Sequence, residues 1–163
     1  MDNLFVPASG TWQPVSPRLA TVRRIEIGAV AAVVVVVGLV LLVLLGDLRW
    51  IGVAVAAVGL AGGAWGWSWA GRNQRSWGYT ENADDLLVTR GVMFKRLVAI
   101  PYGRMQFVDV QAGPLARAFG IATVTLHTAS TETAADIPGL ASGEATRLRN
   151  RLTELGESRG AGL

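Results

Sequence analysis

Two long apolar runs dominate the first half of the chain. Ile25–Leu45 spans 21 residues whose one charged residue, Glu26, lies at the edge, and Trp50–Ala70 repeats that length without any charge. An α-helix rises about 1.5 Å per residue, so each run would form a helix ~31 Å long, close to the thickness of a bilayer core. The pattern predicts two membrane-spanning helices, at about residues 25–45 and 50–70.

The connection between the runs is too short for anything except a reversal of direction. It consists of residues 46–49, so the two helices must be antiparallel neighbours in a hairpin that covers about residues 23–71. Arginines gather at the two outer ends of this hairpin (Arg18, Arg23, Arg24, Arg72 and Arg75), against Arg49 alone in the turn. The positive-inside rule then predicts a multi-pass protein of the cell membrane with both termini in the cytoplasm.

Two other interpretations of the first run are weaker. A pair of buried helices in a soluble protein would seldom be this long and this apolar. A cleaved signal peptide would have a shorter apolar region, and the nearby Ala-x-Ala sequence, Ala54–Ala56, falls inside the second run. We therefore expect no cleavage.

Small residues line the second run. Gly59 and Gly63, and likewise Gly62 and Gly66, are four residues apart, a spacing that allows close approach to the first helix or to another copy of the chain. Neither run has an ionisable residue in its middle, so the sequence offers no ion path or proton relay there.

The pattern changes after Ala70 from continuous apolar runs to short alternating segments. Residues 1–22, with three prolines, are expected to be a loose cytoplasmic tail. Turn residues separate six short β-branched or alternating runs, which predicts a small antiparallel sheet. These runs are Trp77–Thr80, Leu86–Arg90, Lys95–Ile100, Met105–Gln111, Ile121–Thr128 and Thr133–Ile137.

A helix is predicted to follow the strands. Ser142 is suited to the N-cap, an apolar stripe recurs at helical spacing, and Gly156 can end the helix. The stripe is Ala145, Leu148, Leu152 and Leu155. We expect it to pack on the sheet, giving a domain over residues 72–157 and a flexible tail over residues 158–163.

Composition removes several classes of function. The chain has no cysteine, which excludes disulfides, cysteine-ligated zinc and thiol chemistry, and its single histidine, His127, falls on the expected solvent face of a strand. The net charge of +3 is spread along the chain and does not indicate nucleic-acid binding. No cofactor, metal site or small-molecule substrate is indicated.

Four segments carry a resemblance to a known family. They are Pro14–Leu19, Leu87–Val92, Ile100–Val110 and Gly113–Val124, with the sequences PVSPRL, LVTRGV, IPYGRMQFVDV and GPLARAFGIATV. Their order and spacing resemble the bacterial membrane proteins with a pleckstrin-homology (PH)-like domain, often called YdbS-like. The resemblance implies an α+β domain after the hairpin, with a sheet or partly open barrel of about six or seven strands and one C-terminal helix.

The segments specify a fold rather than a reaction. Gly91 is placed to turn between two strands, Gly113 and Pro114 to begin a short helical segment at Leu115–Phe119, and Gly120 to end it. The other motif positions are Pro101, Arg104, Val108, Asp109 and Val110.

Eukaryotic PH domains that bind phosphoinositides carry Lys and Arg between their first two strands. Here we expect that connection to be Thr80–Asp85, whose three carboxylates would repel a phosphate.

Three hypotheses for function remain. The favoured one is a non-enzymatic, membrane-anchored interaction or scaffold module that self-associates or binds other membrane proteins. The second is a sensor of anionic lipid in the inner leaflet, through Arg72, Arg75, Arg147 and Arg151. The third, a membrane-bound enzyme, would have to recruit Asp84, Asp85 and Asp109.

Overall fold

The computed structural model describes residues 11–128 and 134–160, with the side chains of residues 159 and 160 left out. Contacts divide the chain into two compact units. One comprises Ala20–Arg72, and the other joins the residues up to Leu19 with those from Asn73 onward. The second unit is therefore assembled from two stretches of chain on either side of the first.

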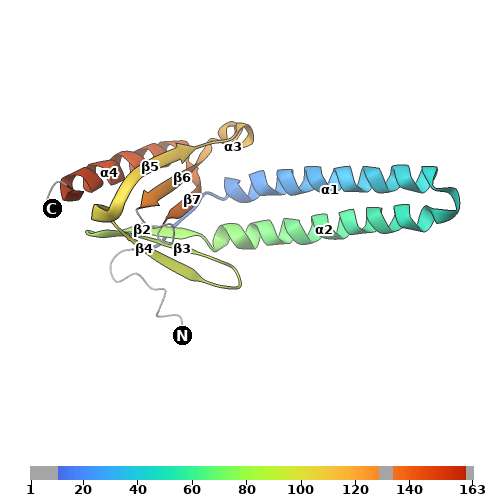
Figure 1. Ribbon diagram of the computed structural model, residues 1–163, viewed down its shortest axis with the longest axis horizontal. Helices are drawn as coiled ribbons and strands as arrows, with labels where there is room; N and C mark the ends of the chain where they lie inside the picture. The colour runs from blue at the N-terminus through green and yellow to red at the C-terminus, as the bar shows by residue number, and fades with distance from the viewer. Residues whose placement is uncertain (1–10, 129–133, 161–163) are drawn as a thin grey trace. The chain divides into compact units, whose positions relative to one another are not determined.

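The first unit is a helical hairpin. Helix α1 (Arg18–Leu44) and helix α2 (Arg49–Arg75) are joined by a one-turn 3-10 helix, η2 (Gly46–Leu48), and run side by side in Figure 1. Both helices are long and apolar enough to cross a membrane. The two predicted spans are confirmed as helices, each extended by several residues at the end away from the turn.

The closest approach of the two helices lies near the turn. A Cβ atom added to Gly38 would lie 2.5 Å from the backbone nitrogen of Ala56, and one added to Gly52 would collide with the backbone at Leu42. The predicted glycines contribute further along the helices: a Cβ on Gly63 would lie 2.9 Å from Ala31. A Cβ atom added to Gly62, in contrast, would meet no atom within 4 Å.

The second unit contains two antiparallel sheets. Strands β1 (Gln13–Pro14), β2 (Gly78–Glu81), β3 (Asp85–Arg90) and β4 (Arg96–Pro101) form the first sheet in that order. Strands β5 (Met105–Gln111), β6 (Ile121–Thr128) and β7 (Ala135–Ala141) form the second. A 3-10 helix, η3 (Tyr102–Arg104), links the sheets, α3 (Pro114–Ala118) joins β5 to β6, and α4 (Ser142–Gly160) follows β7.

The core lies between the sheets and α4 (Figure 1). On β6, Ala122, Val124 and Leu126 are buried, whereas Thr123, Thr125 and His127 on the other face are half-buried, as the alternation predicts. Three residues of the helical stripe, Ala145, Leu148 and Leu152, are buried on the same core, and Leu155 is half-buried. Residues of the core include Leu86, Ile100, Tyr102, Ile137, Ala145, Leu148 and Leu152.

The segment before α1 is part of the domain, which corrects the expectation of a loose tail for the described residues 11–19. Gln13 and Pro14 pair with Tyr79 and Gly78 of β2. Val15 is buried, and the backbone amide of Ser16 donates a hydrogen bond to the carbonyl oxygen of Gly139 at 2.9 Å. The prolines allow this because an edge strand does not need every backbone N–H.

The connection between the first two strands is accordingly the helical hairpin, and not Thr80–Asp85 as expected. The turn after Glu81 joins the second strand to the third. The carboxylate-rich turn therefore gives no argument about the connection at which eukaryotic PH domains bind phosphate.

Two predicted element ends were wrong. Gly156 does not end α4, which continues to Gly160, so residues 158–160 of the expected flexible tail are helical. The strand expected from Thr133 is described from Ala135 and extends to Ala141. It can include Pro138 and Gly139 because β7 is an edge strand of its sheet. Thr133 and residues 161–163 lie outside the described residues.

Candidate functional site

A polar cluster joins β2 to α4 and contains two of the expected lipid-facing arginines. Arg147 donates hydrogen bonds to Glu144 on its own helix, with Nη2 2.6 Å from Oε1, and to Glu81 at the end of β2. The Tyr79 hydroxyl, also on β2, lies 2.8 Å from Glu144 Oε1 and donates to it. Arg151 reaches the same Glu81 carboxylate with its Nε at 4.0 Å. The cluster thus uses Arg147 and Arg151 to fasten the helix to the strand.

The electrostatics of the cluster favour an ionised Glu144 carboxylate and a neutral Tyr79 phenol. Hydrogen bonds from Arg147 are the largest influence on Glu144, and they hold the pKa of its carboxyl below the usual range. Burial, followed by the hydrogen bond to Glu144, raises the pKa of Tyr79. The hydrogen bonds of Arg147 to Glu144 and Glu81 raise the pKa of its guanidinium. The arginine is fixed in its charged form.

The remaining expected basic residues lie elsewhere. Arg72 and Arg75 are exposed in the last turn of α2. Arg75 is close to the start of β2, whereas Glu81 is at the opposite end, about 10 Å away along a strand of this length. The structure therefore does not gather Arg75, Arg147 and Arg151 into one basic patch.

The three carboxylates that an enzyme would need are separate structural residues. Asp85 accepts a hydrogen bond from Asn82 Nδ2 at 2.8 Å, and the Asp84 carbonyl accepts one from the amide of Tyr102 at 3.2 Å. Asp109 accepts one from Gln111 Nε2 at 2.7 Å on a different sheet. Among the described residues, no three His, Asp or Glu side chains come together as metal ligands would.

The motif positions shape the backbone as expected. Gly91 and Gly120 have φ angles of +113° and +64°, which side-chain-bearing residues seldom adopt. Gly113 precedes α3, and Pro114 occupies its first turn. The other positions fall in regular structure: Pro101 ends β4, Arg104 ends η3, and Val108, Asp109 and Val110 lie in β5, opposite Leu126, Thr125 and Val124 of β6.

An exposed aromatic pair was missed by the sequence analysis. Phe107 on β5 remains 57% exposed, and its ring stacks on that of His127 on β6, with centroids 4.1 Å apart and planes 14° apart. The histidine had been assigned to the solvent face, and it is half-buried against this ring. The signal available in the sequence was Phe107 itself, an aromatic residue between Gln106 and Val108 in a predicted strand.

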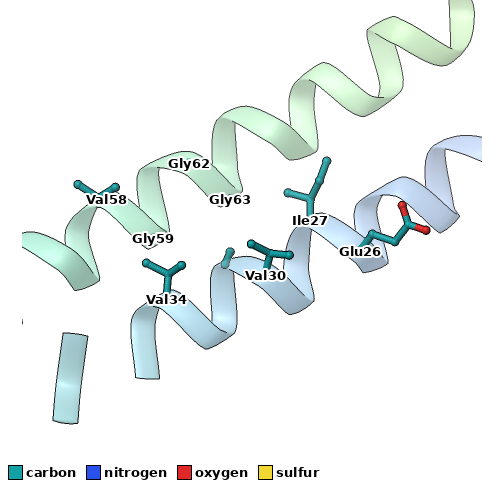
Figure 2. A pocket seen from close by; sticks show the side chains of 9 residues that line it. Glu26, Ile27, Val30, Val34, Val58, Gly59, Gly62 and Gly63 are labelled. Atoms are coloured by element: carbon teal, nitrogen blue, oxygen red, sulfur yellow. The ribbon is translucent and has the colours of Figure 1, made fainter. Parts of the chain in front are cut away.

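The hairpin carries an apolar groove of its own (Figure 2). Side chains of α1, including Val30 and Val34, line one side of the groove. Glycines of α2 line the opposite side, where no side chains fill the space. Glu26 supplies the one carboxylate among the residues lining this groove. The groove offers shape and apolar surface and no set of reacting groups.

A family comparison accounts for this architecture. The model of the bacterial PH domain family matches residues 15–156 and so includes the helical hairpin together with the strands that follow it. The chain belongs to the bacterial PH domain family.

Among curated proteins, this bacterial PH domain protein is similar to the UPF0699 transmembrane protein YdbS of Bacillus subtilis (strain 168). The two are 34% identical over 79 residues, which cover 48% of each chain. The chain thus spans about half the length of the relative that it matches. No solved structure matches it significantly. With its two long apolar helices, the chain is a membrane protein with a bacterial PH domain.

Proposed function

We propose that the protein is a non-enzymatic, membrane-anchored interaction module whose PH domain binds another membrane protein or a second copy of the chain. The observation that carries this proposal is the exposed Phe107 ring on β5, which is an edge strand of its sheet. Edge strands can accept a further strand from a partner, and aromatic side chains are enriched at protein interfaces. The Asp85 and Asp109 carboxylates accept hydrogen bonds in a turn and along a strand, which supports a role without catalysis.

A photo-cross-linking residue at position 107 tests this role in intact membranes. It is expected to give discrete protein adducts, whereas the same residue at Glu154, exposed on α4, gives none. A Phe107→Ser variant should lose the partner during co-purification in mild detergent and keep its thermal stability, because the ring is largely exposed. Purification of a monomer alone, with no adduct at position 107, would contradict the proposal.

The proposed orientation puts both termini and the PH domain in the cytoplasm of a cell whose plasma membrane the hairpin spans. Its support is the surplus of arginine at the inner ends of α1 and α2. The chain has no cysteine, so single cysteines at Asp47 and Glu157 can report on it. A membrane-impermeant maleimide should label position 47 in intact cells and position 157 only after permeabilisation. The opposite pattern would overturn this orientation.

A second candidate function, recognition of anionic lipid, is favoured by the exposure of Arg72 and Arg75. Arginines just beyond a membrane span are attracted to a negatively charged leaflet. An Arg72→Ala/Arg75→Ala variant would then bind fewer anionic lipids during native purification. Unchanged lipid content would remove this candidate and leave the interaction module in place.

A further inference from the structure

The β3–β4 hairpin ends in a solvent-exposed apolar loop. We call its three central residues, Val92, Met93 and Phe94, the apolar tip. Met93 and Phe94 are each 86% exposed, and Val92 is 37% exposed. Single exposed apolar residues are common on proteins, but three in a row at the end of a hairpin are costly to keep in water.

A tight backbone turn at Gly91 leaves the apolar tip exposed. Gly91 has a φ of +113°, and a Cβ atom at this position would collide with the carbonyl oxygen of Phe94. The chain therefore closes tightly on itself between β3 and β4, and the three apolar side chains are left on the outside of the turn. No side-chain-bearing residue fits the space at Gly91.

Basic residues surround the tip. Arg90 ends β3, and Lys95 and Arg96 begin the return strand, with Arg90 directly opposite Arg96 in the pairing. The sequence has no acidic residue between Asp85 and Asp109, so the end of the hairpin that carries the tip is rich in basic residues. Apolar residues flanked by cations suit a bilayer that contains anionic lipid. The apolar side chains can enter its hydrocarbon core while the cations contact its headgroups.

Strand register fixes the side of the domain from which the tip projects. Gly78, the first residue of β2, pairs with Thr89, and the tip begins three residues later. The guanidinium of Arg90 lies over the ring of Trp77, 5.8 Å from its centroid, and the Trp77 indole N–H donates to Asn73 in the last turn of α2. The tip thus projects at the edge of the PH domain where the chain arrives from the membrane span.

We propose that the apolar tip inserts into the leaflet from which α2 emerges, with Arg90, Lys95 and Arg96 at the anionic headgroups. The insertion gives the PH domain a membrane attachment in addition to the helical hairpin. It goes beyond the proposed interaction module, since it concerns how the domain is held at the bilayer and involves no protein partner. Phe107, on which the proposed interaction module rests, lies on the other sheet.

Site-specific fluorescence in the full chain tests the insertion. A Phe94→Cys variant carrying an environment-sensitive fluorophore is reconstituted into nanodiscs of phosphatidylcholine with one-third phosphatidylglycerol. An Ala83→Cys variant is the control, because Ala83 is exposed in the turn between β2 and β3, at the opposite end of these strands. Spin-labelled lipid should quench the probe at position 94 several-fold more strongly than the probe at position 83.

The other outcomes would overturn the proposal. Equal, weak quenching at the two positions would place the tip in water. A probe at position 94 that is shielded from aqueous iodide but not quenched by spin-labelled lipid would mean that a protein surface or a second copy covers the tip.

Proteolysis gives a measurement that needs no probe. Trypsin cleaves after Lys95 and Arg96, and insertion should slow this cleavage several-fold in nanodiscs relative to a Met93→Ser/Phe94→Ser variant. Because both side chains are almost fully exposed, this variant should keep the fold, which its melting temperature in detergent can verify. Equal cleavage rates of the two proteins in nanodiscs would contradict insertion.

Discussion

The side-chain amide of Gln74 donates a buried hydrogen bond to the backbone carbonyl oxygen of Val15, 2.9 Å away. Val15 lies just before α1 and Gln74 in the last turn of α2, so the bond joins the two ends of the helical hairpin. On the domain side of this bond, β1 pairs with β2. The hairpin is therefore an insertion between two paired strands of the PH domain, and the domain is connected to it by two polypeptide segments.

Removing this bond should destabilise the PH domain. A Gln74→Met variant keeps the length of the side chain but leaves the Val15 carbonyl buried without its donor, which typically costs about 1–3 kcal/mol of unfolding free energy. The expected result is a lower melting temperature in detergent. The neighbouring Arg75→Ala variant is the control, since Arg75 is exposed and should melt like the wild type. Identical melting of all three proteins would show that the bond contributes nothing.

The packing of the helical hairpin near its turn should depend on two glycines. Replacing Gly38 or Gly52 with Leu would force the helices apart, because even a Cβ atom collides with the facing backbone. Cysteines placed at Ala31 and Gly63 on facing positions should then cross-link less efficiently than in the parent chain, which has no cysteine of its own. A Gly62→Leu variant, at a position with open space, should cross-link normally. Efficient cross-linking of the Gly38→Leu chain would argue against this packing.

Acid should weaken the junction between β2 and α4. The folded protein lowers the pKa of Glu144 below its ordinary value of 4.5, so the unfolded chain takes up this proton more readily. The stability that Glu144 contributes is fully present above pH 4.5 and is lost as the pH falls through the lower folded-state pKa. A Glu144→Gln variant should be less stable than the wild type at neutral pH and approach it in acid. Parallel melting curves of the two proteins down to pH 3 would be evidence against this coupling.

Sequence patterns were sufficient for the regular parts of the fold. Both spans follow from the length of the two apolar runs. The alternation in β6 and the apolar stripe of α4 follow from residue spacing, because burial on one face requires that spacing. Strands Met105–Gln111 and Ile121–Thr128 were predicted at the bounds that the structure gives them. The glycine turns could be placed because few other residues adopt positive φ.

Contacts between distant segments could not be obtained in this way. The pairing of Gln13–Pro14 with β2 involves two residues, one of them a proline. Two residues are too few to show the alternation by which a strand is predicted. Arg147 looked like a free cation on a helix surface because its partner Glu81 is 66 residues away in the sequence. Similarly, the helix contact at Gly38 and Gly52 depends on the register between two spans, which neither span encodes alone.

Hydrogen exchange of the segment before α1 tests the central claim, that the helical hairpin is inserted within the PH domain. In the full chain in detergent micelles, the amide of Ser16, bonded to Gly139 of β7, should exchange about 100-fold or more slowly than an unstructured amide. Its protection should fall in the Gln74→Met variant, because that substitution removes the bond at Val15. Rapid, unprotected exchange of Ser16 in the wild type would contradict the account, since residues 11–19 would then be a tail outside the domain.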